Sequence, residues 1–481
     1  MRKWLGFGLV ILLLLAFLPA GLGILAKKSL DKLVAELPMP ESMTLSLQDY
    51  KFGWLSSYVA FKVHVVKTES TARYIADQTL DVIIHGDIAH GPILMTDKGL
   101  RTGVARIDTH SKAKDFSGLS ARGAKELALF FKDNDILRAS SLFQILRGIT
   151  IDLSSSPIHV DLAGDNLQWN GFDAKIKLNH EFDQLHTHII FSPILFTTQN
   201  GAILDTAKGE YIAQMYREEK SIWLGEQILT LPTFYLKDEQ GAIMRFDHLR
   251  VMSVGNVIDH LLEASLDIEA DNVEMNNQHI EQLRFDVEVS DFENDAVLAL
   301  SKIIHKPQPL SADDKQLAFK LITEALAPGA NIEVDYMLNM QSERVLLHGK
   351  LDFPNITDKF DNNTAVNAQQ LLQGLNAQLD FTAPQPLVSD LLFDMTWSAL
   401  TKQFGGEPDA AQEEAVKQMM DAQVQMLVDN GAFVQEGNNY HLEFDYEQGN
   451  MILNQKPVTQ GELFLLIMLL FQVTPDESIT H

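Results

Sequence analysis

The chain has 481 residues, of which 46% are hydrophobic and 21% charged, a balance typical of folded rather than disordered proteins. Its 65 acidic and 38 basic residues give a formal net charge of −27, which repels polyphosphates and argues against nucleic acid as a partner. Because there is no cysteine, disulfides, thiolate zinc sites, iron–sulfur clusters and an acylated N-terminal cysteine are all excluded.

An uncharged apolar segment stands near the start of the chain. It runs from Trp4 to Ala26, and as a helix it would be about 34 Å long, enough to cross a bilayer. We predict an uncleaved anchor over residues 1–28, with a cleaved signal peptide as the alternative. Since a long globular region follows a single N-terminal span, we expect a single-pass protein of the bacterial inner membrane. Its N-terminus would be cytoplasmic and its bulk periplasmic.

The stretch from Tyr50 to Val63 changes the face on which its apolar residues lie. Even-numbered positions are apolar up to Trp54, and odd-numbered positions are apolar from Val59 onward. One extra residue in a strand moves every later side chain to the other face. We therefore predict a bulge or tight bend around Ser56 and Ser57 that forms a corner in a curved sheet. A polar binding site made by the two serines is the alternative.

His90 is the most conspicuous catalytic-looking residue, because Asp87 precedes it and Gly91 and Pro92 follow it. A general base needs a group that orients it. An offset of three residues on a strand places the side chains of Asp87 and His90 on opposite faces. The group is therefore better explained as a strand end that Gly91 and Pro92 impose.

Most of the remaining chain alternates with a period of two. Seven segments place mainly apolar residues on one face: Ile158–Leu162, Phe172–Leu178, Leu185–Phe191, Leu283–Val289, Ile332–Met340, Leu375–Phe381 and Tyr440–Tyr446. The intervening positions are mostly polar, so these strands should build curved, largely antiparallel sheets with one face in water. Turn residues such as Gln448–Asn450 separate successive strands. The predicted fold class is α+β and rich in strands, after a single transmembrane helix.

His186 and His188 share the polar face of one of these strands, because residues two apart on a strand point the same way. A metal site needs three or four convergent ligands, and here only two have a definite geometry. They are weak candidates, and we predict neither a metal nor a cofactor. The sequence contains no phosphate-binding glycine loop, nucleophile elbow or zinc-protease helix motif. We therefore predict a protein that is not an enzyme.

Helical spacing of apolar residues appears in four segments. They are Ser120–Arg147, Ser311–Ala327, Leu391–Phe404 and Pro408–Gly431. The first predicts one or two helices with Leu142 among the apolar contacts. Ser311 followed by Asp313 and Asp314 resembles a capping box, and Gly431 is the expected stop of the last helix.

The candidate boundary between two domains lies near Lys302–Ala312, where Pro307 and Pro309 interrupt the alternation of apolar and polar residues. We therefore predict three parts. They are the membrane anchor over 1–28, an N-terminal β-rich periplasmic region over 29–305 and a C-terminal α+β periplasmic region over 306–481.

Several landmarks occur in an order that resembles one bacterial family. After the anchor come Gly53-Trp54-Leu55-Ser56-Ser57, Ile88-Ala89-His90-Gly91-Pro92-Ile93, Leu167-Gln168-Trp169-Asn170-Gly171-Phe172, Pro328-Gly329-Ala330-Asn331-Ile332 and a stretch from Met451 to Pro457. The set resembles the YdgA-like family of bacterial envelope proteins of unknown function over nearly the whole chain. The resemblance implies a single-span inner-membrane protein with a β-rich periplasmic region, and it supplies no catalytic residues. Where the family tends to have Asn-Gly in its terminal turn, this chain has Asn454-Gln455.

The landmark residues are interpreted as a structural motif. Its members are Gly53, Trp54, Ser56, Ser57, His90, Gly91 and Pro92. No ligand-binding residue is assigned.

Together these features favour a non-enzymatic envelope protein that acts as a structural or interaction module. Its partners would be the inner membrane, through Trp4 to Ala26, and a second copy or another envelope protein. The run Leu463–Phe471, too short to span a bilayer, is a candidate interface. The alternative is the binding or transfer of a lipid-like ligand in a sheet-lined groove, and an envelope hydrolase is favoured least. An open trough lined by Phe and Leu would favour lipid, whereas a dry core would favour the interaction module.

Overall fold

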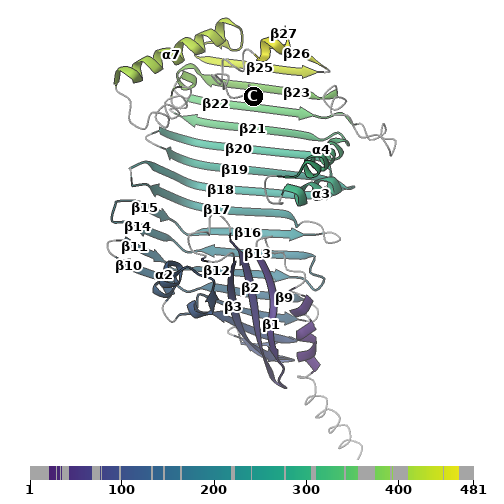
Figure 1. Cartoon of the computed structure of the whole chain (residues 1–481). Coiled ribbons are helices and arrows are strands. Elements are labelled where there is room, and N and C mark those ends of the chain that lie inside the picture. The colour runs from purple at the N-terminus through teal and green to yellow at the C-terminus, as the bar shows by residue number, and fades with distance from the viewer. Residues whose placement is uncertain are drawn as a thin grey trace, which may run out of the picture. The chain divides into compact units, whose positions relative to one another are not determined.

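The structure is a computed structural model of the chain, and it contains two compact units (Figure 1). It describes residues 21–28, 30–32, 34, 43–67, 76, 79–96, 99–131, 134–144, 147–162, 165–217, 223–239, 241–275, 278–304, 310–340, 343–355, 374–389, 393, 410–447 and 449–464. The units are Met1–Leu249 and Arg250–His481. Both are built mainly from antiparallel strands, so the predicted β-rich class with a few helices is confirmed.

The first unit is a meander of antiparallel strands. Its strands are β1 (Met43–Lys51), β2 (Ser56–Val66), β3 (Thr79–His90), β4 (Ile93–Thr96), β5 (Gly99–Thr102), β6 (Ala105–Ser111), β7 (Phe116–Ser117), β8 (Leu137–Gln144), β9 (Gly148–Ser155), β10 (Ile158–Leu162), β11 (Asp165–Trp169), β12 (Phe172–Leu178), β13 (Gln184–Phe191), β14 (Ile194–Thr197), β15 (Ile203–Thr206), β16 (Gly209–Tyr216) and β17 (Leu224–Lys237). The main series runs β1–β2–β3–β6–β8–β9–β12–β13–β16–β17. Neighbours in this series are close in the chain, as short connections favour.

Four neighbouring extended segments of this unit are each interrupted by a short break, and the four breaks lie side by side across the sheet. β9 and β10, β11 and β12, β13 and β14, and β15 and β16 are successive pieces of the same extended segments, and β17 pairs with both β15 and β16. Pro157 and Pro193 stand at two of the breaks, where a missing N–H cannot extend the ladder. Gly171 stands at a third with a φ of 83°, a conformation that favours glycine.

A helix at the start of the described chain packs on this sheet. Residues 21–28, 30–32 and 34 are helical. Leu22, Ala26 and Leu30 are spaced by four residues, so they lie on one face of the helix. They form the main core of the unit with Val59 and Ile88.

The change of face between Tyr50 and Val63 comes from a hairpin and not from a bulge within one strand. β1 and β2 are antiparallel, and residues 52–55 connect them. Both strands turn their apolar residues toward the same core, so the parity changes across the connection. The predicted tight bend between two strand segments is therefore confirmed. The bulge alternative is wrong at this position, because the bulge of the pair lies earlier, between Leu47 and Asp49.

The segment Ser120–Arg147 is part helix and part strand. α2 (Ala121–Phe131) follows Ser120, whose hydroxyl oxygen accepts a hydrogen bond from the N–H of Gly123 at 3.0 Å. The 3₁₀ turn η1 (Ala113–Asp115) precedes it. A second helix is wrong, because Leu142 lies in β8, between β6 and β9. Pairing with two neighbours overrides a local pattern that fits either structure.

The second unit continues the antiparallel arrangement. Its strands are β19 (Leu261–Met275), β20 (Gln278–Glu293), β21 (Asn331–Met340), β22 (Glu343–Asp352), β23 (Asn376–Pro384), β24 (Val434–Glu436), β25 (Asn439–Glu447), β26 (Asn450–Leu453) and β27 (Lys456–Val458), and β18 (Ile243–Ile258) contains the boundary between the units. They pair in the order β19–β20–β21–β22–β23–β25–β26–β27, and β24 also pairs with β25. All seven strands predicted from alternation are confirmed, and β25 and β26 pair across the predicted turn, with Glu447 opposite Asn450.

Helices α3 (Asn294–Ile304), α4 (Ala312–Leu326) and α7 (Ala410–Asp429) belong to this unit, and residues 385–389 and 460–464 are helical as well. The predicted cap is confirmed, since the Ser311 hydroxyl oxygen accepts the N–H of Asp314 at 3.1 Å. The helix predicted before Gly431 is α7, and Gly431 has a φ of 76°. Apart from residue 393, the predicted helix Leu391–Phe404 lies outside the described residues.

The predicted boundary near Lys302–Ala312 falls inside the second unit. It separates α3 from α4, whose side chains Ile303 and Leu321 share one buried cluster. The chain divides instead after Leu249.

Among the residues that the structure describes, no helix combines the length and the apolarity needed to cross a membrane. Residues 4–20 of the predicted anchor lie outside the described residues. The last part of the predicted span is helical, and Leu22 and Ala26 are buried in the core of the first unit. The run Leu463–Phe471 is outside the described residues from residue 465 onward.

Candidate functional site

The second unit carries an apolar sheet face. One register row across it consists of Ile268, Phe285, Tyr336, Leu347 and Phe381. The next row consists of Leu266, Val287, Val334, Gly349 and Leu379. We call these two rows, which cross β19 to β23, the apolar face.

This face is incompletely covered. β21 and β22 are central strands with a neighbour on each side, yet no residue of either strand is buried. In a sheet packed against a second layer, the inward side chains of central strands would be buried. Tyr336 is partly buried, and this burial raises the pKa of its hydroxyl. The apolar face is therefore half-exposed: it is shielded from water in part but not covered.

Helices reach this part of the unit only near its margins, as far as the described residues show. Figure 1 shows α3 and α4 at one end of the strands and α7 near the other. α7 contributes Val424 and Leu427 to a cluster against which Phe381 packs. The α3–α4 pair packs with Phe292 at the end of β20. The middle of the apolar face belongs to neither cluster.

The opposite face of the same strands carries a row of mainly charged side chains. One register row reads Asp267, Asp286, Asp335, His348, Asp380 and Glu443. Burial, then the hydrogen bond with Asp286 and the nearby charge of Glu269, raise the pKa of Asp267 to about 6. Burial opposes the ionisation of Asp286 as well, but hydrogen bonds from Arg284 and Asp267 outweigh it and lower its pKa. We call this set the charged row.

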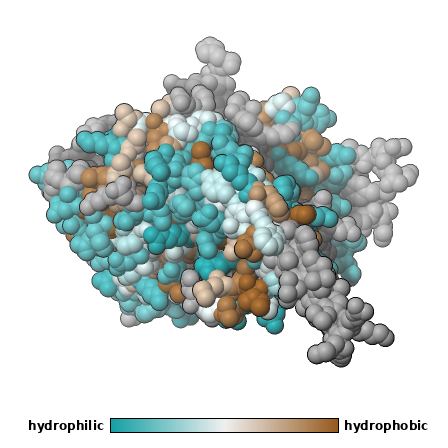
Figure 2. All heavy atoms as spheres, turned by 90° about the horizontal axis from the view of Figure 1, so that it is seen from below, coloured by the Kyte–Doolittle hydropathy of each residue, from teal (hydrophilic) through white to brown (hydrophobic). Residues whose placement is uncertain are grey.

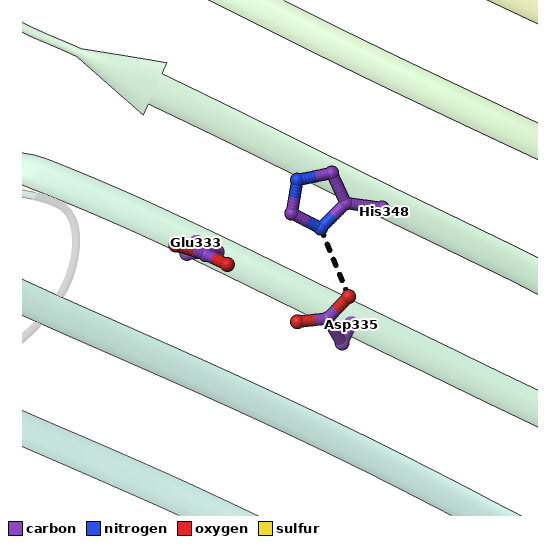
Figure 3. A group of neighbouring side chains, drawn as sticks. All are labelled: Glu333, Asp335 and His348. Carbon is purple, nitrogen blue, oxygen red and sulfur yellow. Dashed lines mark hydrogen bonds and ion pairs between the residues drawn. The ribbon is translucent and has the colours of Figure 1, made fainter.

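Within and beside the charged row, Glu333, Asp335 and His348 place one potential metal-ligand atom each within 4.8 Å of one another (Figure 3). Glu333 and Asp335 share a face of β21, and His348 stands opposite Asp335 on β22. His348 Nδ1 lies 2.9 Å from Asp335 Oδ1, and the two side chains are 36% and 53% exposed. The His348 ring and the Asp335 carboxylate are hydrogen-bonded to each other and exposed to water. An ordinary cross-strand pair therefore accounts for the closeness of these side chains, and no metal ion is needed.

His186 and His188 lie on the polar face of β13, as their spacing predicts. His188 Nε2 lies 2.6 Å from Glu210 Oε1 on β16, and both side chains are about half-exposed. In the described part of the chain, neither histidine belongs to a group of three metal-ligating side chains.

The first unit contains a polar hollow that the sequence did not indicate. Its volume is about 610 Å³, and its floor is one register row across the sheet. The row consists of Asp87, Asp108, Ser140, Asp152, Lys175 and His188. Each strand shows only an ordinary polar position, and the row exists only once the pairing order is known.

The motif around His90 is brought together by the fold. His90 Nε2 lies 3.0 Å from Ser57 Oγ, and His90 Nδ1 lies 3.2 Å from the backbone carbonyl oxygen of Trp54. A carbonyl only accepts, so Nδ1 carries the proton and a neutral ring accepts the Ser57 hydroxyl proton at Nε2. Ser57 Oγ also accepts the N–H of Gly53 at 3.2 Å. The ring therefore fastens the β1–β2 connection to the end of β3.

The other residues of the predicted structural motif do not contact the His90 ring in the same way. Ser56 is exposed, and the peptide bond between Gly91 and Pro92 is cis. Asp87 is exposed and His90 buried, on opposite faces as expected. Because a backbone carbonyl occupies His90 Nδ1 and both Ser57 and His90 are buried, this pair lacks the orienting carboxylate and the access that a nucleophile needs.

These features define a β-rich protein whose sheet is apolar on one face and charged on the other. Over residues 1–460 the sequence matches the model of a bacterial protein family of unknown function, DUF945, and the chain belongs to this family. A comparison with curated proteins finds none that matches the chain.

Proposed function

We propose that the chain is a non-enzymatic, membrane-anchored protein of the bacterial envelope that holds the acyl chain of a lipid-like ligand on the apolar face. The observation that carries this proposal is the absence of any buried residue in the central strands β21 and β22. The apolar segment Trp4 to Ala26 and the resemblance to YdgA-like envelope proteins support the location.

The dimensions of the apolar face suit an acyl chain. Five strands are separated by four spacings, or about 19 Å at roughly 4.8 Å each. An acyl chain spans half of a hydrocarbon core of about 30 Å, or about 15 Å. Covering half-exposed side chains such as Phe285 and Leu347 would release about 25 cal/mol for each Å² removed from water.

A structural or interaction module is the second candidate, and one observation favours it. Met419 and Met426, two turns apart on α7, are both exposed. Flexible methionine side chains suit a protein-binding surface. A second copy or another envelope protein would then cover this side of α7, and lipid would be absent.

Native mass spectrometry of the full chain in a mild detergent, followed by lipid extraction, separates the two candidates. We expect lipid at a defined stoichiometry in the wild-type protein. Val334→Gln and Leu347→Gln should reduce it severalfold, because each places an amide on the apolar face. The matched controls Glu333→Gln and Lys350→Gln, on the opposite face of the same strands, should retain it.

Circular dichroism checks that all four variants fold. A lipid-free wild-type protein would overturn the proposal, and a lipid-free dimer would support the interaction module. Equal lipid content in the Val334→Gln, Leu347→Gln and control variants would place the ligand elsewhere.

A further inference from the structure

Exposed apolar side chains surround the buried His90 on three segments of the first unit. The β1–β2 connection exposes Phe52, Trp54 and Leu55. The helix of residues 21–28 exposes Ile24 and Leu25. The β4–β5 hairpin, which follows directly after Pro92, exposes Ile93, Met95 and Leu100. We call these side chains the apolar collar.

Hydrogen bonds and close packing hold two of the three segments, the β1–β2 connection and the helix, to His90. The N–H of His90 donates to the carbonyl of Leu55 at 3.0 Å. Gly23 faces the imidazole so closely that a Cβ there would lie 2.5 Å from the ring. The hydroxyl of Tyr50 donates to the carbonyl of Gly23 at 3.3 Å. These contacts fix the β1–β2 connection and the helix against each other. The β4–β5 hairpin is joined to them through Gly91 and Pro92, whose backbone is hydrogen-bonded to Val104 and Gly103.

The β4–β5 hairpin has one face of hydrocarbon. Met95 pairs with Leu100, and Ile93 alternates with the buried Leu94. Ile93, Met95 and Leu100 are 67%, 77% and 69% exposed. Exposed hydrophobic groups that cluster in this way mark an interaction surface rather than the scattered apolar residues of an ordinary surface.

Two stretches of the chain that carry collar side chains are free of charge. Residues 52–61 and 91–96 contain no charged side chain, in a protein that is 21% charged. Figure 2 shows hydrophobic side chains at several places on the face seen from below, among hydrophilic ones.

The chain itself indicates what covers the collar. In the sequence, the helix that carries Ile24 is preceded by residues 4–20, which are all uncharged and mostly apolar. As a helix, that stretch would extend about 25 Å, enough for most of the hydrocarbon core. The described helix that follows this stretch in the sequence packs at Gly23 against His90 and the β1–β2 connection.

We propose that the apolar collar rests in the bilayer interface around the point where the anchor leaves the membrane. Trp54 and Phe52 would lie at the headgroup level, where aromatic side chains are enriched. The aliphatic side chains of the β4–β5 hairpin would enter the acyl boundary. This inference rests on the anchor in the proposed function and adds a second membrane contact to it.

Because the chain has no cysteine, single labels can be placed without background. Leu55→Cys and Met95→Cys report on the collar, and Leu317→Cys, an exposed apolar position on α4, is the matched control. Each full-length variant is labelled with an environment-sensitive fluorophore and reconstituted in vesicles of phosphatidylethanolamine and phosphatidylglycerol. Flotation and quenching by aqueous iodide are then measured.

The expected result is flotation of all three proteins, with iodide quenching reduced severalfold at positions 55 and 95 but not at 317. Flotation with equal quenching at all three positions would overturn the collar and leave the anchor intact. Failure to float would overturn both. Protection of positions 55 and 95 in detergent that increases with protein concentration would show that a second copy covers them, and would also overturn the bilayer contact.

Discussion

The hydroxyl oxygen of Ser57 lies 3.0 Å from Nε2 of His90, and both side chains are buried. The contact joins residues that are 33 positions apart and fixes the tautomer of the ring, because Nδ1 must donate to the carbonyl of Trp54. It lies beneath the apolar collar and beside the first helix. Contacts of this kind, between single side chains, predict how individual substitutions change the stability of the protein.

Replacing Ser57 by Ala removes one hydroxyl from this site. The N–H of Gly53 and Nε2 of His90 then lose a partner, and His90 is buried. We expect a loss of about 1–3 kcal/mol in the free energy of unfolding, measured by urea denaturation. Ser56→Ala is the matched control and should change it by less than about 0.5 kcal/mol, because Ser56 is exposed. Equal effects would contradict a structural role for the contact.

Two glycines of the first helix should respond in opposite directions. A Cβ at Gly23 would lie 2.5 Å from His90, whose ring is held by two hydrogen bonds and cannot move aside freely. Nothing lies within 4 Å of a Cβ at Gly21. Gly21→Ala should therefore raise the melting temperature through a gain of roughly 0.5–1 kcal/mol, whereas Gly23→Ala should lower it. A stabilising Gly23→Ala substitution would show that the helix does not pack on His90 as described.

Asp267 makes stability depend on pH. Its folded pKa of about 6 lies above the ordinary value of 3.8, so the folded state binds this proton more tightly than the unfolded state. Ionisation therefore costs stability as the pH rises from about 4 to about 6, by up to about 3 kcal/mol above that window. Asp267→Asn should be more stable than wild type at pH 7.5 and equal to it below pH 4.

Thermal unfolding across this pH range tests the prediction. Asp380→Asn, an exposed member of the charged row, is the control and should differ from wild type by less than about 0.5 kcal/mol. An unchanged or lower melting temperature for Asp267→Asn at pH 7.5 would show that the ion pairs with Arg250 and Arg284 outweigh burial.

The helix cap at Ser311 offers a test in the second unit. Ser311→Ala removes the acceptor of the Asp314 N–H and should cost about 1 kcal/mol in unfolding free energy. Ser311→Asp keeps an acceptor at the N-cap and should restore stability. The unfolding free energy of both variants is measured by denaturant titration. If Ser311→Ala is as stable as the wild-type protein, Ser311 does not act as a helix cap.

The pair of His348 and Asp335 should contribute little, because both side chains are largely in water. His348→Ala is expected to change the unfolding free energy by less than about 1 kcal/mol. The melting temperature of the wild-type chain should not depend on zinc. A zinc-dependent rise that disappears in His348→Ala would show that Glu333, Asp335 and His348 bind the ion.

The sequence by itself determined seven of the strands and the helices α4 and α7, because alternation and capping are local properties of the chain. Phe172–Leu178 and the cap at Ser311 were predictable for this reason. Leu142 was not, since a short apolar run fits a helix or a strand until its neighbours are known. The change of face after Tyr50 likewise fits a bulge or a hairpin.

Only the tertiary structure decided which residues meet. The charged row, the polar hollow of the first unit and the contact between Ser57 and His90 join distant segments, and period-two alternation carries no information about pairing order. The exposure of the apolar face was likewise not predictable from the sequence. Alternation shows that one side of β21 is apolar, but whether another layer covers that side depends on where the rest of the chain lies.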